Sequence, residues 1–314
     1  MNRKNDREEH RERFEVLISQ KAPKHKTWFG AYFEYSISNV TEIPSKKVCL
    51  MALCEIHLNH SEAIGKMSSL RVILPEGKRG PFPVLYLLHG LGDDHTAWTR
   101  RTNLERYLED WPLIVVMPDS ERGWYTDAAQ LLNRNFETYI ARELVDFVDA
   151  SFQTIPCRQS RALAGLSMGG YGAIKLALKH PDLFGAAVSH SGAFGSRSQA
   201  DIENPGAQWA WLREFVPVFG EHMRGSDNDV FALAEKYASS STRSTTRSGD
   251  LALRLDCGTD DFLIEENRAF HAHLQQLGIA HEYAEHDGEH NWSYWDAHIQ
   301  DTLEFVARAM NLSQ

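Results

Sequence analysis

Residues 161 to 176 read Arg-Ala-Leu-Ala-Gly-Leu-Ser-Met-Gly-Gly-Tyr-Gly-Ala-Ile-Lys-Leu, and this stretch decides the fold. Its apolar beginning predicts a buried strand, and the apolar residues at helical spacing that follow predict a helix ended by His180-Pro181. Between the two, Gly165-Leu166-Ser167-Met168-Gly169 fits the Gly-x-Ser-x-Gly nucleophile elbow. Glycines on both sides of Ser167 let the strand and the helix pass close together. We therefore predict that Ser167 presents its hydroxyl at a tight strand-to-helix turn.

An elbow of this kind also predicts an oxyanion hole made of backbone N–H groups. The Met168 N–H lies at the first turn of the predicted helix, where it has no intrahelical acceptor and can donate to a developing oxyanion. A second donor is expected from the Leu91 N–H, because His89-Gly90-Leu91 follows another apolar strand. We expect His89 to shape this loop and to take no part in proton transfer.

A serine hydroxyl needs a base and an orienting carboxylate, and both occur later in the chain. His290 lies just before the last predicted helix, and Asp260 and Asp261 lie just past a predicted strand. The order Ser, Asp, His, each on a loop at the carboxyl end of its own strand, is that of α/β-hydrolases. On spacing alone, either of the two aspartates could be the acid.

Alternation of apolar runs and helical patterns predicts the α/β-hydrolase fold, with a mostly parallel central sheet and helices on both faces. Besides the elbow strand, strands are expected at 48–58, 69–74, 81–88, 113–117, 186–190, 251–257 and 280–284. Helices are expected at about 103–109, 135–151, 230–237 (started by Ser226 or Asp227), 265–277 and 294–310. Residues 193–248, after the sixth strand, lack this alternation and are predicted to be a cap-like insertion.

The chain of 314 residues is expected to hold a charged N-terminal extension, residues 1–30, and one catalytic domain, residues 31–314. Its first thirteen residues are densely charged without an apolar core, so we expect no secretory signal and a cytoplasmic location. The formal net charge of -10 argues against nucleic acid or an anionic membrane as partner. A monomer and a homo-oligomer both remain open. The cysteines lack Cys-x-x-Cys spacing and are expected to be free thiols: Cys49, Cys54, Cys157 and Cys257.

Over roughly residues 48–310 the chain resembles the esterase D and tributyrin esterase group. Its wider relatives are S-formylglutathione hydrolase, feruloyl and acetyl-xylan esterases and the antigen 85 mycolyltransferases. The resemblance is carried by Leu88-His89-Gly90, Val116-Met117-Pro118-Asp119, Trp124-Tyr125-Thr126-Asp127, Gly165 to Ala173, His180 to Phe184, Ser191-Gly192, Cys257 to Leu263 and Gly288 to Trp292.

This resemblance implies a carboxylic-ester hydrolase acting on a small-molecule ester through an acyl-enzyme, without metal or cofactor. It implies Ser167 as nucleophile, His290 as base and Asp261, three residues after Gly258, as acid. The N-terminal extension is not part of the family pattern. The loop after His89-Gly90 lacks the cysteine-containing sequence of formylglutathione hydrolases, which argues against that substrate.

Four aromatic residues are predicted to bind substrate: Trp124, Tyr125, Trp209 and Trp211. Aromatics in an insertion can instead pack it onto its own domain, so both roles stay open for the two in the insertion. If they wall the site together with Phe215 and Phe219, acyl groups from acetyl to butyryl are expected to be preferred.

Three alternative hypotheses about the function remain. His286 and His290 have the spacing of two helical metal ligands, but Asp287 and Gly288 between them indicate a loop, and no His-Glu-x-x-His motif occurs. We therefore predict no metal site. Acyl transfer to an alcohol would use the same acyl-enzyme as hydrolysis. A non-enzymatic binding protein on the same fold would be favoured by loss of a catalytic residue, and none is missing.

Overall fold

The structure is a computed structural model that describes residues 51–195, 214–240 and 250–312. The predicted N-terminal extension, residues 1–30, lies outside the described residues, as do Trp209 and Trp211. No helix in the described part of the chain is both long enough and apolar enough to cross a membrane.

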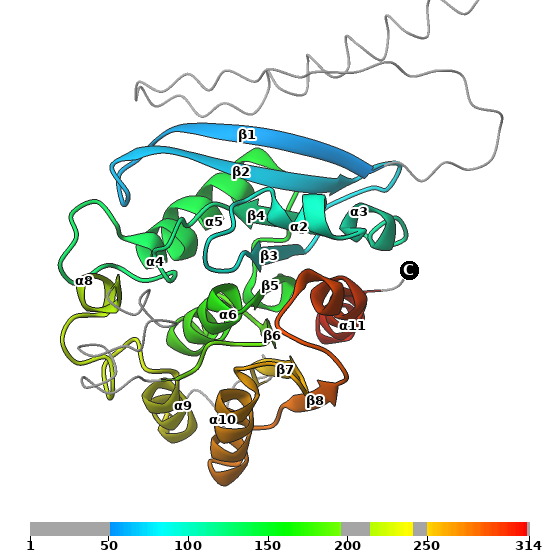
Figure 1. Ribbon diagram of the computed structural model, residues 1–314. Coiled ribbons are helices and arrows are strands. Elements are labelled where there is room, and N and C mark those ends of the chain that lie inside the picture. Colours follow the sequence, from blue (N-terminus) through cyan, green and yellow to red (C-terminus); the bar gives the residue numbers. More distant parts are fainter. Residues whose placement is uncertain (1–50, 196–213, 241–249, 313–314) are drawn as a thin grey trace, which may run out of the picture. The chain divides into compact units, whose positions relative to one another are not determined.

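Eight strands form one sheet in the order β1-β2-β4-β3-β5-β6-β7-β8 (Figure 1). β2 is antiparallel to both β1 and β4, and all the other neighbours are parallel, so the sheet is mostly parallel as predicted. The strands are β1 (Met51–Ser61), β2 (Lys66–Pro75), β3 (Val84–Leu88), β4 (Ile114–Pro118), β5 (Arg161–Leu166), β6 (Ala186–His190), β7 (Ala252–Gly258) and β8 (Glu282–His286). β3 to β6 are buried along their whole length, which explains their continuous apolar runs.

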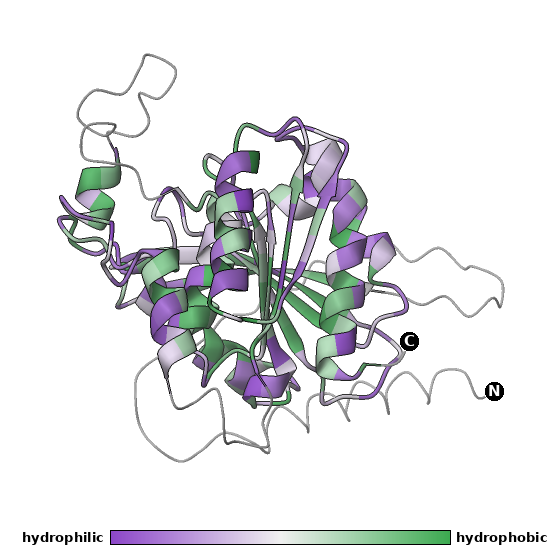
Figure 2. Cartoon of the chain, turned by 90° about the horizontal axis from the view of Figure 1, so that it is seen from below, coloured by the Kyte–Doolittle hydropathy of each residue, from purple (hydrophilic) through white to green (hydrophobic). Residues whose placement is uncertain are grey.

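Helices cover both faces of this sheet, and their apolar sides turn inward (Figure 2). One face packs against α4 (Phe136–Thr138), the π-helical η1 (Tyr139–Leu144), α5 (Val145–Ser151), α6 (Met168–Lys179), α8 (Phe215–Phe219), α9 (Val230–Ser239) and α10 (Ile264–Gln276). The other face packs against α2 (Ala97–Arg101), α3 (Leu104–Tyr107) and α11 (Trp292–Met310). A short 3-10 turn, η2 (Arg158–Ser160), leads into β5.

Several predicted boundaries are corrected by the structure. β1 and β2 both extend into the segment between the strands predicted at 48–58 and 69–74. Only four residues therefore join them, and one of these, Gly65, has a φ of 62°. α9 is started by Asp229, whose carboxylate accepts the Phe231 N–H, and neither Ser226 nor Asp227 caps it. The strand expected at 280–284 begins at Glu282, and the last helix begins two residues earlier than expected.

The described part of the insertion divides into two pieces. α8 lies next to the elbow helix through the Tyr171 and Phe219 rings, whose centroids are 6.0 Å apart. α9 belongs to the helical layer of the domain, because the Tyr237 hydroxyl accepts the Leu251 N–H at 2.9 Å and Tyr237 is buried in the core.

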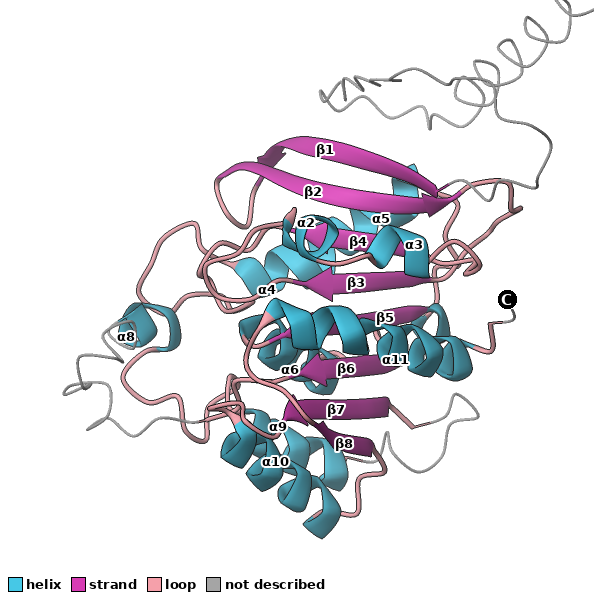
Figure 3. Cartoon of the chain, turned by 45° about the vertical axis from the view of Figure 1, so that its right-hand side comes forward, coloured by secondary structure: helices cyan, strands magenta, loops and turns pink. Residues whose placement is uncertain are grey.

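β3, β5, β6, β7 and β8 are parallel, so their carboxyl ends meet at one edge of the sheet (Figure 3). The loops that leave this edge carry His89, Ser167, Ser191, Asp261 and His290. In open α/β sheets this edge is where ligands bind. The topology therefore gathers the predicted site residues in one place.

Candidate active site

Ser167 lies at a turn whose geometry depends on its two flanking glycines. Its φ of 52° and ψ of −113° are unusual for a residue with a side chain, and it immediately precedes α6. A Cβ on Gly165 would lie 2.5 Å from the Gly169 carbonyl oxygen, and one on Gly169 would lie 2.5 Å from the Leu88 carbonyl oxygen. Strand and helix therefore approach more closely than any other residue would permit, as the elbow pattern predicts.

Asp261 and His290 form a hydrogen-bonded pair across two loops. The His290 Nδ1 lies 2.8 Å from one carboxylate oxygen of Asp261 and 3.0 Å from the other. Asp261 is 2% exposed, whereas Asp260 is exposed and its N–H donates to the Gly288 carbonyl. Of the two neighbouring carboxylates, only Asp261 faces the imidazole.

The environment of Asp261 keeps its carboxyl ionised. Burial raises its pKa, but the hydrogen bond and charge of His290, with the N–H of Leu263, outweigh burial and hold the pKa below its ordinary value. A carboxylate that accepts Nδ1–H of His290 leaves Nε2 of the neutral ring as a proton acceptor. The pair thus has the arrangement of a general base with its orienting acid.

Ser167 and His290 open into the same cavity of about 230 Å³. The residues that line it come from the loops at the carboxyl edge of the sheet, from α8 and from the start of α10: Leu91, Trp124, Ser167, Ala193, Gly195, Phe215, Phe262, Leu263, Glu266 and His290. Hydroxyl and imidazole therefore face one space that a small ligand can occupy.

Two backbone N–H groups next to Ser167 are available to an incoming oxyanion. Met168 is the first residue of α6, and Leu91 lines the cavity beside the serine. Within the described residues, neither N–H has a hydrogen-bond acceptor. Unpaired donors of this kind, fixed before a ligand arrives, are what an oxyanion hole requires.

His89 holds the loop that presents Leu91. Its ring is buried, its Nδ1 lies 2.9 Å from the Gly90 carbonyl oxygen, and its Nε2 lies 3.0 Å from the Ser120 backbone nitrogen. One tautomer of the neutral ring satisfies both contacts, with Nδ1–H as donor and Nε2 as acceptor. His89 therefore shapes the loop, as expected from the sequence.

Comparison with known proteins agrees with this geometry. The family model described as putative esterase matches residues 61–306. The chain belongs to this esterase family. An acetyl esterase of Caldicellulosiruptor saccharolyticus is 28% identical over 82% of this chain and 99% of its own. Among solved structures, the Staphylococcus aureus fluorophosphonate-binding serine hydrolase F is 28% identical with a TM-score of 0.70, over 82% of this chain and 98% of its own. The S-formylglutathione hydrolase FrmB of the same organism is 29% identical with a TM-score of 0.69, over 82% and 99%.

A second buried histidine–aspartate pair in this esterase lies close to Ser167 but outside the cavity. His190 Nδ1 lies 2.8 Å from Asp256 Oδ1, and its Nε2 lies 2.7 Å from the Thr302 hydroxyl. Asp256 Oδ1 also accepts the Tyr294 hydroxyl at 3.1 Å. Because both ring nitrogens of His190 are engaged and the ring is fully buried, this pair braces the sheet beneath the elbow and offers no base to a ligand.

Of the residues predicted to bind substrate, the structure separates Trp124 from Tyr125. Trp124 lines the cavity, whereas Tyr125 is fully buried and its hydroxyl donates to the His89 carbonyl oxygen at 2.9 Å. Both residues have φ near 50°, and the Lys175 ammonium donates to the Tyr125 carbonyl and the Thr126 hydroxyl behind them. The predicted substrate contact of Tyr125 is therefore corrected: Tyr125 fixes the His89 loop.

The aromatic wall of the cavity is built from Trp124 and α8. The Trp124 ring centroid lies 4.8 Å from that of Phe215 and 5.8 Å from that of Phe219. Phe215 lines the cavity, and Phe219 packs behind it at 5.0 Å without lining it. Trp209 and Trp211 were predicted to join this wall, but they lie outside the described residues.

Phe262 and Glu266 are among the cavity residues that the sequence patterns did not single out. Phe262 lines the cavity and is 56% exposed, and its ring centroid lies 4.6 Å from that of His290. Glu266 lines the cavity and accepts the Gly195 N–H at 2.7 Å. Its place in the first turn of the helix that follows the Asp261 loop was the signal, because that turn begins at the ligand-binding edge of the sheet.

Proposed function

We propose that this protein is a serine carboxylesterase that cleaves short-chain acyl esters through an acyl-enzyme on Ser167. The observation that carries the proposal is the single cavity shared by an elbow serine, an aspartate-paired histidine and the Leu91 loop. Relatives named acetyl esterase and S-formylglutathione hydrolase support acyl esters as the substrate class. A chromogenic acetyl ester tests the activity directly, and no turnover above background would contradict it.

The proposed reaction has two steps that use the same residues. His290 Nε2 takes the Ser167 proton while the oxygen attacks the ester carbonyl, and the N–H groups of Leu91 and Met168 hold the resulting oxyanion. The imidazolium then gives its proton to the departing alcohol, which leaves an acyl group on Ser167. Water attacks this acyl group by the same route and restores the free hydroxyl, while the Asp261 carboxylate stabilises the imidazolium in both steps.

A second candidate, S-formylglutathione hydrolysis, is favoured by the likeness to FrmB but opposed by the loop after His89-Gly90. Both candidates use the same acyl-enzyme and differ in the leaving group, a thiol in one and an alcohol in the other. We expect oxygen esters of short acids to give the larger kcat/KM. Measuring S-formylglutathione beside methyl and sugar acetates decides between them, and adding a competing alcohol separates acyl transfer from hydrolysis.

We expect kcat/KM to be highest for acetyl to butyryl esters. The aromatic wall of Trp124 and Phe215 limits the cavity, so an extra methylene with no room forfeits about 0.8 kcal/mol of burial and adds strain. The measurement is a p-nitrophenyl ester series. Phe215→Ala is expected to move the preference to longer chains, whereas Phe219→Ala, a matched change behind the wall, is expected to leave it unchanged. A rate that keeps rising past eight carbons in the unmodified protein would show an open site.

Activity is expected to fall as the pH is lowered, because a protonated imidazole cannot accept the Ser167 proton. The Asp261 carboxyl is expected to stay ionised at mildly acidic pH, because its pKa lies below the ordinary value. The measurement is the pH dependence of kcat/KM. A rate that does not fall with pH while the protein stays folded would rule out a protonatable base.

We place the protein in the cytoplasm. The proposal is supported by three thiols, of Cys54, Cys157 and Cys257, all of them free in the structure, since structural disulfides belong to oxidising compartments.

A further inference from the structure

We propose that this protein binds a divalent transition-metal ion outside the active site, through His286, His298 and Asp301. His286 ends β8, and the other two lie three residues apart on α11, so that they share one face of the helix. One donor atom from each side chain lies within 4.8 Å of the other two. No second group of three such side chains occurs in the described ranges.

Two of the three distances between donor atoms are close to those around a single ion. Two ligand atoms about 2.1 Å from a tetrahedral zinc ion stand about 3.4 Å apart. The Asp301 Oδ2 lies 3.0 Å from His298 Nδ1 and 3.9 Å from His286 Nε2, on either side of that value. The two imidazoles are stacked, with centroids 4.1 Å apart and 15° between their planes. Binding therefore requires one ring to turn about its Cβ–Cγ bond, a torsion with a broad minimum.

His286 supplies an independent observation. Its Nε2 atom is buried and has no hydrogen-bond partner among the described residues. Buried polar atoms in folded proteins almost always have a partner, because an unsatisfied one costs about 1–3 kcal/mol. A metal ion bonded to Nε2 would satisfy this atom.

The charges around the three side chains also admit a cation. The Arg254 guanidinium lies 3.5 Å from Asp301 and would compete with an ion. Arg254 has two other carboxylates, Glu282 at 3.2 Å and Asp256 at 3.7 Å, so that Asp301 can be released to a metal. Glu282 is shared with Arg308 at 2.9 Å. Three carboxylates thus face two guanidinium groups, which leaves an excess of negative charge.

Two imidazoles and one carboxylate are the donors that Zn²⁺, Ni²⁺ and Cu²⁺ prefer, whereas Mg²⁺ and Ca²⁺ prefer oxygen alone. None of the three residues lines the catalytic cavity, so the ion would take no part in ester cleavage. It would instead join the end of β8 to α11. The His286 carbonyl accepts the Thr259 N–H at 2.9 Å, and His290 follows four residues later. The ion would therefore clamp the segment that carries the catalytic base.

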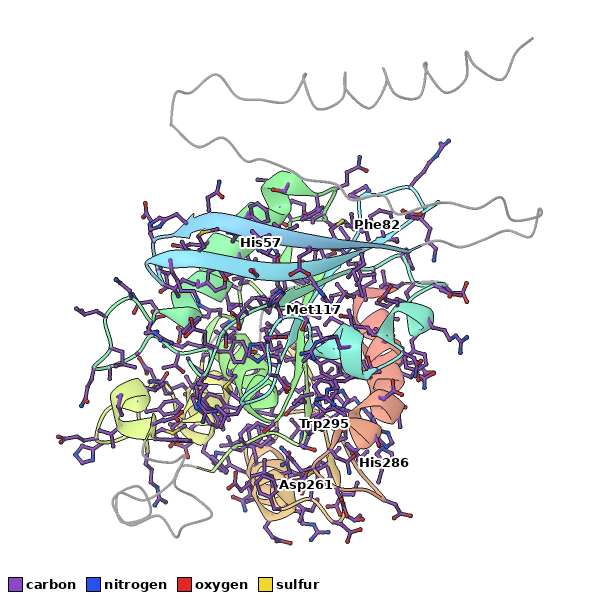
Figure 4. The ribbon with its side chains drawn as sticks, turned by 45° about the horizontal axis from the view of Figure 1, so that its top comes forward. His57, Phe82, Met117, Asp261, His286 and Trp295 are labelled. Carbon is purple, nitrogen blue, oxygen red and sulfur yellow. The ribbon has the colours of Figure 1, made fainter. Side chains whose placement is uncertain are left out.

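The experiment uses the full chain, stripped with a chelator and titrated with Zn²⁺ by calorimetry. One equivalent is expected to bind and to raise Tm, and His298→Ala and Asp301→Asn are each expected to weaken that binding at least about ten-fold. The matched control is His57→Ala, which removes an imidazole from β1. β1 and β8, the strand of His286, are the two outermost strands on opposite sides of the sheet (Figure 4). The His57→Ala protein is expected to bind Zn²⁺ as the unmodified protein does.

Co²⁺ provides a second readout, because its visible absorption reports nitrogen and oxygen ligands and should disappear in both variants of the site. Asp301→Asn keeps both imidazoles, so a loss of affinity in this variant shows that the carboxylate is a ligand even if His298→Ala folds poorly. Unchanged affinity in both variants, or an equal loss in His57→Ala, would overturn the proposal. Ester hydrolysis by the stripped enzyme is expected to continue, which keeps this test separate from that of the proposed function.

Discussion

Ser167→Ala is expected to lower kcat for ester hydrolysis by a factor on the order of 10⁵ to 10⁶, and His290→Ala by a similar factor. The two residues form one proton-transfer unit, since the hydroxyl is a poor nucleophile until the imidazole removes its proton. Combining both changes is therefore expected to cost little more than either alone. Steady-state kinetics with an acetyl ester measure all three proteins.

The matched control is Ser160→Ala, because Ser160 directly precedes the elbow strand and Ser167 directly follows it. Ser160 lies at the other end of β5 from the cavity, so its removal is expected to leave kcat unchanged. Circular dichroism and Tm show whether each variant keeps its fold. Near-wild-type turnover in a folded Ser167→Ala protein would contradict the assignment of Ser167 as the nucleophile.

Asp261→Asn is expected to reduce kcat by about 10⁴-fold, whereas Asp260→Asn is expected to have little effect. The His290 imidazole is oriented by both carboxylate oxygens of Asp261, and an amide there can donate to Nδ1 and select the wrong tautomer. Asp260 is exposed, and its backbone N–H donates to the Gly288 carbonyl in the His290 loop.

The two variants are each other's control, because they make the same chemical change at adjacent positions of one loop. Thermal unfolding separates catalysis from stability, and in Asp261→Asn the amide oxygen can still accept the Leu263 N–H, which Asp261 Oδ1 accepts at 2.8 Å. If Asp260→Asn were the damaging change, the acid would be misassigned by one residue.

The positions of the buried strands and the mostly parallel sheet could be predicted because the sequence carries their physical cause. β3 to β6 are covered on both faces, so each reads as an unbroken apolar run. The elbow could be predicted because Gly165 and Gly169 leave no room for a Cβ. In both cases one short segment determines the local structure by itself.

Features that depend on the detailed course of the backbone in a turn could not be predicted. Trp124 and Tyr125 look equivalent in the sequence, but successive positive φ values send one ring to the cavity and the other into the core. Asp229 caps α9 because the preceding turn leaves its carboxylate beside the Phe231 N–H, although Ser226 and Asp227 are equally good caps by composition.

Another limit applies to the proposed metal ligands. The sequence predicted no metal site, because Asp287 and Gly288 break the helical spacing of His286 and His290. In the fold, His290 pairs with Asp261, and His286 stacks on His298. The stacking of His286 on His298 joins β8 to α11, and no local sequence pattern predicts it. The chemistry of short segments could be predicted from the sequence, whereas contacts between side chains of different elements are seen only in the folded structure.

The proposed mechanism requires Ser167 to become acylated, and trapping the acyl-enzyme detects this step. The protein is mixed with a large excess of p-nitrophenyl acetate, quenched in acid within the first turnovers, digested with protease and analysed by mass spectrometry. We expect the peptide that contains Ser167 to be heavier by the mass of one acetyl group. We expect no acetylated peptide from Ser167→Ala. Acetyl found only on another residue, or turnover that persists while Ser167 stays unmodified, would contradict the mechanism.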